Sequence, residues 1–327
     1  MKPISIIICT RNRPFELTKL LESLTCATAP FDGHFSIMVI DSSLSTETKS
    51  VAAKFANVLP IMLHTVHSDF SLTKKRNFAI QQLRSQSEFV FFLDDDIEVR
   101  DDFFLNTLAV FEDAGVVGVG GRDLNLPPLN IKKWQEMVGL SSLRQGAVLM
   151  NGQNTPYSFS QGNLEVEWFS GCAMSFRTSA LEGLLFDERR AFVGEDVDFC
   201  MRMNLKGKLI SNPDIVYKHK SSLESVPSSN HKIRDFAFHR SLLAFESDGR
   251  VRFLPTLFTV FILGLLIMIK GAIKLKWDLF CLGIRHIGGA FLLIHFGALV
   301  ILARMKSFLG KTLKIGSSKD GISERED

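Results

Sequence analysis

The stretch "FVFFLDDDIEVRDDFF", residues 89–104, joins an apolar run to a cluster of acids. Five consecutive apolar residues, 89–93, predict a strand that is buried on both faces. Asp94, Asp95 and Asp96 follow at the end of this strand. Adjacent carboxylates repel one another and are costly to bury unpaired, so the cluster raises the question of which cation balances it.

The first 121 residues alternate short apolar runs with helical patterns. Continuous apolar strands separated by helices predict an α/β fold, in which a mostly parallel, Rossmann-like sheet is covered by helices on both faces. We expect strands over 4–9, 35–40, 59–66, 88–93 and 115–121, and helices from Pro14 and over 46–56, 71–85 and 101–114.

Polar side chains gather where the predicted strands end. Parallel α/β sheets bind ligands outside the carboxyl ends of their strands, so we expect these residues to form a pocket. Those that follow the first, second and fourth strands are Thr10, Arg11, Asn12, Arg13, Asp41, Asp94, Asp95 and Asp96.

Asp94, Asp95 and Asp96 are predicted to hold a divalent cation. Carboxylate oxygens without sulfur or clustered histidine favour hard cations, here Mg²⁺ or Mn²⁺. If the backbone stays extended, Asp94 and Asp96 point the same way and Asp95 points elsewhere. The alternative is a solvated acidic turn that caps the helix expected near residue 101.

Three further segments carry candidate residues, each with a structural alternative. In "LTKKRNFAI" (72–80), lysine and arginine would neutralise a diphosphate, or the run is an exposed helix face. "GED" (194–196) offers two acids at a helix start, where acids also serve as caps. His219 in "IVYKHKSS" is either a ligand or a structural histidine.

Taken together, these segments resemble the bacterial family-2 glycosyltransferases, which have the GT-A fold. The matching stretches run in the family's order over residues 1–220: "SIIICTRNRP", Asp41, "LTKKRN", "FFLDDD", "VEWFSGCAMSFR", "GEDVDF" and His219. The resemblance implies a metal-dependent enzyme that transfers a sugar from a nucleotide-diphospho-sugar donor to an acceptor hydroxyl. The acceptor would be a glycan or a lipid-linked molecule in surface polysaccharide or glycolipid assembly.

The resemblance also implies a role for each candidate residue. The metal would be held by Asp94 and Asp96, with Asp96 as the expected direct ligand and His219 as a further metal or diphosphate contact. Asp196 would be the catalytic base, with Glu195 beside it. The donor nucleotide would contact Thr10, Arg11, Asn12, Asp41, Lys74, Arg76, Asn77 and Asp95. The acceptor side would include Gly171 and Trp168, whose indole can pack on a sugar face.

One departure from the family concerns the donor's base. The family often has a second acid and a glycine after the position of Asp41, whereas this chain reads "DSSLST" (41–46). The reaction type depends on other residues. One predicted base and no second carboxylate nucleophile indicate direct displacement, which inverts the anomeric centre.

Charge and hydropathy divide the chain in two. Residues 1–230 carry 23 Lys+Arg and 27 Asp+Glu, whereas residues 231–327 carry 15 and 8 and hold the long apolar runs. A basic, apolar tail is typical of association with an anionic membrane surface. We expect a glycosyltransferase domain over 1–228, with a nucleotide-sugar half (1–121) and an acceptor half (122–228), and a helical membrane-associating region over 229–327. Within the acceptor half, 122–163 is irregular and predicts a long loop.

The two apolar runs, 253–269 and 287–303, are each 17 residues long, the lower limit for a helix that crosses a bilayer. Three arrangements stay open: a transmembrane hairpin, two helices lying among membrane lipids in the interface, or a soluble homo-oligomer interface. Five scattered cysteines and the lack of a signal peptide predict a reducing compartment. The enzyme would therefore work on the cytoplasmic face of the cell membrane.

The net charge of +3 is too small to indicate nucleic acid as a partner. Two other functions are compatible with aspartates at strand ends. A non-catalytic sugar-nucleotide-binding or scaffold protein would share the fold, although the acid pairs and His219 together disfavour it. A nucleotidyl or phosphoryl transferase would need a glycine-rich phosphate loop or an aspartyl nucleophile after the first strand, where this chain has "TRNRP" (10–14).

Overall fold

The computed structural model describes most of the chain. The described residues are 3–31, 34–83, 87–125, 136, 142, 144–156, 162–190, 193–220 and 229–317. They fall into two compact units, the second of which comprises the chain from Ser229 onward together with Leu149–Gln153. Half of the segment expected to be irregular, 122–163, lies outside the described residues.

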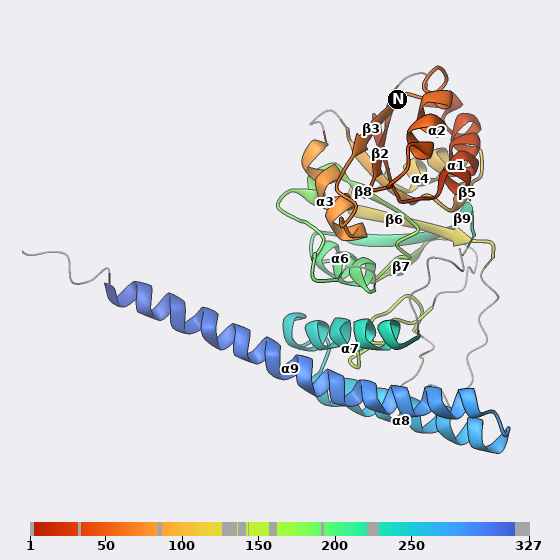
Figure 1. Ribbon diagram of the computed structural model, residues 1–327. Helices are drawn as coiled ribbons and strands as arrows, with labels where there is room; N and C mark the ends of the chain where they lie inside the picture. Colours follow the sequence, from red (N-terminus) through yellow and green to blue (C-terminus); the bar gives the residue numbers. More distant parts are fainter. Residues whose placement is uncertain are drawn as a thin grey trace, which may run out of the picture. The chain divides into compact units, whose positions relative to one another are not determined.

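The first unit is a mixed sheet flanked by helices (Figure 1), and each predicted strand and helix up to residue 121 is present with small changes in its bounds. The strands are β1 (Ile4–Thr10), β2 (Phe35–Asp41), β3 (Ile61–Thr65), β4 (Phe89–Asp94), β5 (Ile97–Val99), β6 (Val116–Asp123), β7 (Leu164–Val166), β8 (Ala173–Arg177) and β9 (Lys208–His219). The helices are α1 (Pro14–Ala27), α2 (Glu47–Phe55), α3 (Leu72–Gln82), α4 (Phe103–Val110) and α6 (Glu195–Met203), with short 3₁₀ turns at Ala29–Phe31 and Thr178–Leu181.

The sheet is parallel in its first half and mixed in its second. The described strands lie in the order β3-β2-β1-β4-β8-β6-β9-β5, with β7 beside β9. Strands β1 to β4 pair in parallel, as predicted from their continuous apolar runs. Strand β8 is antiparallel to both β4 and β6, and β5 is antiparallel to β9. Only Asp95 and Asp96 separate β4 from β5, which pairs with β9 and not with β4.

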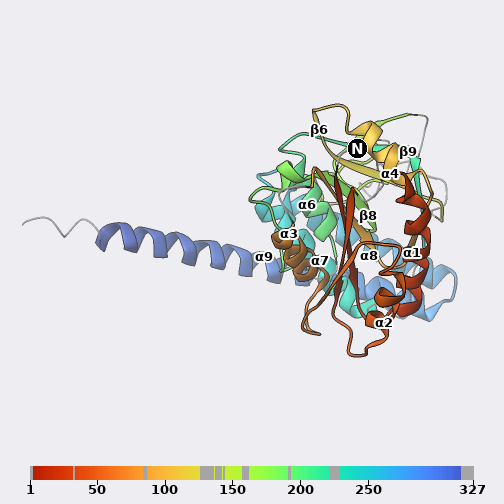
Figure 2. The same cartoon turned by 90° about the horizontal axis from the view of Figure 1, so that it is seen from above.

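Two apolar clusters cover the two faces of the sheet. Ile4, Ile6 and Ile8 of β1 pack in one cluster, and Ile7 and Cys9 pack in the other, as alternate residues of a strand point to opposite faces. Figure 2 views the sheet edge-on, with α1, α2 and α4 on one side and α3 and α6 on the other. The prediction of burial on both faces is confirmed for β1 and β4, whereas β3, at one end of the strand order, is only half-buried.

Local sequence signals explain where the helices next to the pocket begin. Pro14 opens α1, a position where its missing N–H costs no hydrogen bond. The Ser71 side chain caps α3 by accepting a hydrogen bond from the backbone N–H of Lys74. Gly194, at φ 71°, precedes α6, in the left-handed region that glycine enters without strain. The N-terminal ends of α1, α3 and α6 therefore carry polar side chains near the carboxyl ends of the strands.

The second unit is helical. It contains α7 (Ser229–Glu246), α8 (Phe253–Ile273) and α9 (Trp277–Ser317). Helices α8 and α9 pack closely through glycines, since a Cβ on Gly283 would lie 2.4 Å from the backbone nitrogen of Met268 and one on Gly264 would lie 2.8 Å from Ile287. Small residues at a helix–helix contact are typical of helices that associate in membranes.

Two segments of these helices are long and apolar enough to cross a membrane. They are Phe253–Ile273 and Phe280–Leu302, with mean hydropathies of 2.3 and 1.7. Only 22% and 28% of their apolar windows are buried, which distinguishes them from the core helices of a soluble domain. Large apolar side chains such as Leu254, Phe258 and Phe291 are exposed. The second unit therefore has the composition and the surface expected for membrane association.

Candidate active site

The sheet topology brings residues from five segments to one edge. Parallel strands β1, β2 and β4 end there, at Thr10, Asp41 and Asp94. Strand β8 runs the opposite way, so it begins at this edge instead of ending there. The backbone N–H of Asp94 donates to the carbonyl of Cys172 at 2.9 Å, just before β8 starts. His219 ends β9 at the same edge, where it pairs with Ile97 of β5.

Arg76 joins the acidic strand end to the start of α6. Its guanidinium donates to the Asp94 carboxylate at 3.1 Å and to the Glu195 carboxylate at 3.3 Å. It also donates to the backbone carbonyl of Gly171 at 2.8 Å and lies over the ring of Phe186 at 5.3 Å. The side chain is 2% exposed. Although burial disfavours its charge, Asp94 and Glu195 hold the pKa of Arg76 above its ordinary value.

The peptide of Gly171 connects Arg76 to the predicted base. Its carbonyl accepts from Arg76, and its N–H donates to the Asp196 carboxylate at 2.9 Å. The second oxygen of Asp196 accepts from the backbone N–H of Val197 at 2.8 Å. Asp196 is therefore held by two backbone groups, one from its own helix and one from the segment before β8, while its side chain stays half-buried.

Burial sets the protonation of the two acids at the start of α6. It raises the pKa of Asp196, although the hydrogen bonds from Gly171 and Val197 and the charge of Arg76 act in the opposite direction. Burial and the neighbouring Asp196 charge also raise the pKa of Glu195, which is buried against Arg76. A carboxylate with a raised pKa is a better proton acceptor than a free aspartate, which is what a general base requires.

The backbone turns after Asp94, so the three aspartates face different partners. Asp95 and Asp96 both accept from the Arg13 guanidinium, at 2.8 and 3.2 Å, whereas Asp94 accepts from Arg76. Asp94 and Asp96 are expected to point the same way if the backbone stays extended. The strand ends at Asp94, so the backbone is not extended and this expectation does not apply. Burial raises the pKa of Asp95 to about 6 despite Arg13. Protein cations therefore balance much of the charge of the cluster.

His219 lies between Asp96 and a cysteine. Its Nε2 is 3.2 Å from the Asp96 carboxylate, and its Nδ1 is 3.6 Å from the sulfur of Cys172. Hydrogen bonding to Asp96, and then to Cys172, raises the pKa of His219 to about 11. Asp123, at the end of β6, accepts from the His219 backbone N–H at 3.1 Å and positions the residue.

The donor set at this edge fits a divalent cation. Single ligand atoms of Asp94, Cys172 and His219 lie within 4.8 Å of one another. Carboxylate oxygen and imidazole nitrogen are common ligands of Mn²⁺ and related ions. Asp96 adjoins this group through His219. Cys172 was missed by the sequence analysis because its thiol comes near His219 only through the antiparallel pairing of β8 with β4.

The loops after β1 and β2 are tied to each other. The Asn12 backbone N–H donates to the Ser43 hydroxyl at 2.7 Å, and its side-chain oxygen accepts from the Leu44 N–H at 3.1 Å. The carboxylate of Asp41 accepts from the Ser43 backbone N–H at 2.9 Å. Ser43 lies in the segment that departs from the family pattern. Its hydrogen bond occupies one carboxylate oxygen of Asp41, which is then less available to a ligand. Arg11 is exposed beside these loops and Thr10 is buried.

The basic run on α3 is largely buried, contrary to an exposed helix face. Lys75 donates to the carbonyl of Thr10 at 3.0 Å and is 6% exposed. Asn77 holds the backbone of Phe186 with hydrogen bonds of 2.7 and 2.9 Å. Lys74 is half-buried over the ring of Phe70, at 5.8 Å. Of the basic residues in this run, Lys74 is the one whose side chain is accessible to a ligand.

Trp168 lies on the segment that leads to β8. Its indole N–H donates to the carbonyl of Thr155 at 2.9 Å, and its ring packs beside the second apolar cluster. The side chain is half-buried. Trp168 is thereby held in place next to the Gly171 peptide, with part of its surface accessible.

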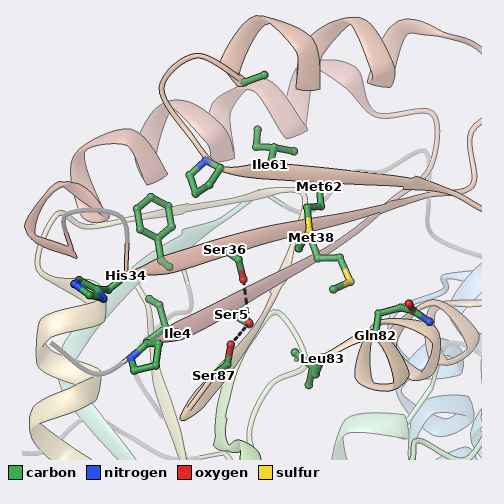
Figure 3. A pocket seen from close by; sticks show the side chains of 14 residues that line it. Ile4, Ser5, His34, Ser36, Met38, Ile61, Met62, Gln82, Leu83 and Ser87 are labelled. Atoms are coloured by element: carbon green, nitrogen blue, oxygen red, sulfur yellow. Dashed lines mark hydrogen bonds between the residues drawn. The ribbon is translucent and has the colours of Figure 1, made fainter. Parts of the chain in front are cut away.

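A pocket of about 580 Å³ lies elsewhere, at the start of β1 and β2 (Figure 3). Ser5, Ser36 and Ser87 form a hydrogen-bonded chain in it, with 3.0 Å between the Ser5 and Ser36 oxygens. Ile4 and Thr10 lie at opposite ends of β1, so this pocket is at the other edge of the sheet. None of the predicted site residues lines it.

A comparison of the sequence with models of protein families identifies its family. The model of "Glycosyl transferase family 2" matches residues 5–185, more than half of the chain. The chain therefore belongs to glycosyl transferase family 2.

Two curated relatives act in polysaccharide assembly, according to their names. The O-antigen biosynthesis protein RfbC of Myxococcus xanthus is 27% identical over 75% of this chain, and the chain spans 20% of that protein. The succinoglycan biosynthesis protein ExoM of Rhizobium meliloti (strain 1021) is 23% identical over 75% of this chain and 77% of its own length.

Solved glycosyltransferase structures share the fold. The mannosyltransferase PcManGT of Pyrobaculum calidifontis, in complex with GDP-Man and Mn²⁺, has a TM-score of 0.58 at 15% identity, covering 90% of this chain and 88% of that one. S. aureus TarS with UDP-GlcNAc has a TM-score of 0.51 at 20% identity, covering 90% and 91%. The predicted GT-A fold with a helical C-terminal region is confirmed.

Replacing Arg76 by methionine tests the buried ion-pair network. We expect Arg76→Met to lower the free energy of unfolding by about 3–5 kcal/mol, since removing one partner leaves buried carboxylates without a counter-charge. Urea denaturation followed by circular dichroism measures the change. Arg76→Met combined with Glu195→Gln should recover part of the loss.

Arg100→Met is the matched control. Arg100 pairs with Asp102 at the surface, where the two side chains are 48% and 44% exposed, and such pairs contribute less than about 1 kcal/mol. Equal effects of Arg76→Met and Arg100→Met would show that the Arg76 network does not stabilise the fold.

Proposed function

We propose that this protein transfers a sugar from a nucleotide-diphospho-sugar to an acceptor hydroxyl, with inversion and with the help of a divalent metal ion. The observation that carries the proposal is the connection made by Arg76 and the Gly171 peptide. It joins the acidic strand end, where a diphosphate would lie, to a half-buried carboxylate suited to remove a proton. Membership of glycosyl transferase family 2 supports the reaction class.

Asp94, Asp96 and His219 would hold the metal ion, Mg²⁺ or Mn²⁺. When bound, the ion would neutralise the charge that develops on the leaving diphosphate. Arg13 keeps Asp95 and Asp96 in place from the side of α1, and Arg76 does the same for Asp94 from α3. The protein thereby holds the acidic turn in one geometry before any ligand arrives.

Asp196 would take the proton of the attacking acceptor hydroxyl. Its two hydrogen bonds from backbone N–H groups fix the carboxylate, and its raised pKa favours proton uptake. Glu195, the other acid of the pair, is 6% exposed and turned toward Arg76, so it is not available as a nucleophile. A single accessible carboxylate supports direct displacement by the acceptor, and therefore inversion.

The donor nucleotide would lie over the loops after β1 and β2. Arg11 and Asn12 lie on the first of these loops, Asp41 is the last residue of β2, and Lys74 is accessible at the start of α3. The names of structural neighbours include complexes with UDP-GlcNAc and with GDP-Man, which support a nucleotide-sugar as donor. Trp168 and Gly171 would face the acceptor.

The acceptor would be a growing glycan or a lipid-linked sugar at the cytoplasmic face of a membrane. The names of the curated relatives support a role in surface polysaccharide assembly. The apolar, exposed faces of α8 and α9 support contact with membrane lipids. Lysines in the connection between these helices, such as Lys274 and Lys276, suit anionic headgroups.

Calorimetry on the protein in mild detergent tests the donor site. We expect one nucleoside diphosphate from a panel of uridine, guanosine, adenosine, cytidine and thymidine diphosphates to bind in the presence of Mn²⁺ and not in its absence. Asp96→Ala should abolish this binding, because the residue holds the metal or the histidine beside it. Asp101→Ala, on the exposed turn nearby, is the matched control. Binding that is independent of metal, or absent for every nucleotide, would favour a structural role for the acidic cluster.

Asp196→Asn tests the assignment of the base. We expect kcat to fall by about 10²–10⁴ while the affinity for the nucleotide stays unchanged, because the amide preserves the shape but cannot accept the proton. Release of nucleoside diphosphate from the donor, with membrane lipid extract as the acceptor source, provides the rate. A variant that keeps more than half of the activity would assign the base elsewhere.

The pH profile of the same reaction provides a second test. The base acts deprotonated, and the pKa of Asp196 is raised above the 3.8 of an ordinary aspartate. The rate should therefore fall with decreasing pH at a higher pH than free aspartate would dictate. An acid limb at the pH of a free aspartate would contradict the assignment of Asp196 as the base.

A further inference from the structure

We propose that Cys172 is a ligand of the metal site, together with Asp94 and His219, and that it gives the site a preference for thiophilic divalent cations over Mg²⁺. The inference rests on the proposed function to the extent that both place a cation at this edge of the sheet. It differs in the ligand set: Cys172 replaces Asp96 as a ligand, and Asp96 positions His219 instead.

The geometry brings the thiol to the cation site from a fixed backbone. The Cys172 carbonyl accepts from the Asp94 N–H at 2.9 Å, so the two residues are neighbours across the sheet. The sulfur lies 3.6 Å from Nδ1 and 3.8 Å from Nε2 of His219. One ligand atom from each of the three residues falls within 4.8 Å of the others. A metal ion with ordinary bond lengths of about 2.0–2.3 Å needs only a small closure of this triangle.

The two buried cysteines of the first unit show what a structural cysteine looks like here. Cys9 and Cys200 are buried among apolar side chains, and the Cys200 sulfur accepts from the backbone N–H of Phe169. Cys172 is only half-buried and faces His219 and the hydroxyl of Ser170, 3.2 Å away. Cys172 also packs against the first apolar cluster, but its sulfur faces these two polar groups of the site.

The donor set determines the kind of cation. Mg²⁺ prefers oxygen ligands in a regular octahedron, whereas Zn²⁺ and Co²⁺ accept a mixture of sulfur, nitrogen and oxygen. Binding would release two protons to solvent, one from the Cys172 thiol and one from the His219 imidazolium, and form a metal–thiolate and a metal–imidazole bond. Three protein ligands leave a coordination position open, as in catalytic sites, where a diphosphate oxygen would enter.

Cobalt absorption spectroscopy on the full chain in detergent tests the ligand directly. We expect Co²⁺ to produce a thiolate-to-metal charge-transfer band in the near ultraviolet in addition to its visible d–d bands. Cys172→Ser should remove the charge-transfer band while the d–d bands persist. Because even outer-shell partners are worth about 10–100-fold in metal affinity, the Kd for Co²⁺ should rise at least about tenfold. Cys26→Ser, at an exposed position on α1, should leave the spectrum unchanged.

Competition with Mg²⁺ completes the experiment. The concentration of Mg²⁺ that displaces Co²⁺ should be lower for Cys172→Ser than for the unchanged chain, because the preference for Co²⁺ depends on sulfur. Calorimetry of the same Co²⁺ titration detects binding independently of the spectrum. If calorimetry and d–d bands show that Co²⁺ binds but no charge-transfer band appears, the role of Cys172 is overturned and the proposed function stands. If neither calorimetry nor absorption shows Co²⁺ binding, both this inference and the metal requirement of the proposed function are overturned.

Discussion

The buried guanidinium of Arg76 is the interaction on which the site depends. A fully desolvated cation is costly, and here its cost is offset by Asp94, Glu195 and the carbonyl of Gly171 together. These partners come from β4, from α6 and from the segment before β8, which are far apart in the sequence. The guanidinium is planar and its N–H donors point in fixed directions, so it sets the positions of these three partners relative to one another. The ammonium group of a lysine has no such fixed geometry and could not replace it.

The same principle explains how three consecutive aspartates are tolerated. Arg76 neutralises the first from one side of the sheet edge, and Arg13 contacts the second and third from the other. His219 adds a further cationic contact to Asp96. The charge of the cluster is thus distributed among separate partners, and a bound metal would complete this balance instead of creating it.

Much of the fold could be predicted from local patterns. Runs such as residues 4–9 and 89–93 are continuous and apolar, so their burial on both faces followed from composition. The antiparallel entry of β8 could not be predicted, because it depends on contacts between residues some 80 positions apart, such as Leu93 and Ala173. The burial of Arg76 and the approach of Cys172 to His219 depend on that pairing. For the same reason, Lys75 and Asn77 looked like an exposed helix face in sequence, although α3 turns them inward.

The peptide of Gly171 has a consequence for how specificity can vary in such a chain. Its N–H holds the carboxylate of Asp196 and its carbonyl holds Arg76, so a displacement of this one backbone unit moves both halves of the site at once. A change in the length of the chain around Gly171 would therefore shift the carboxylate and the guanidinium together. We expect changes of substrate to arise from side chains around this backbone unit and not from insertions within it.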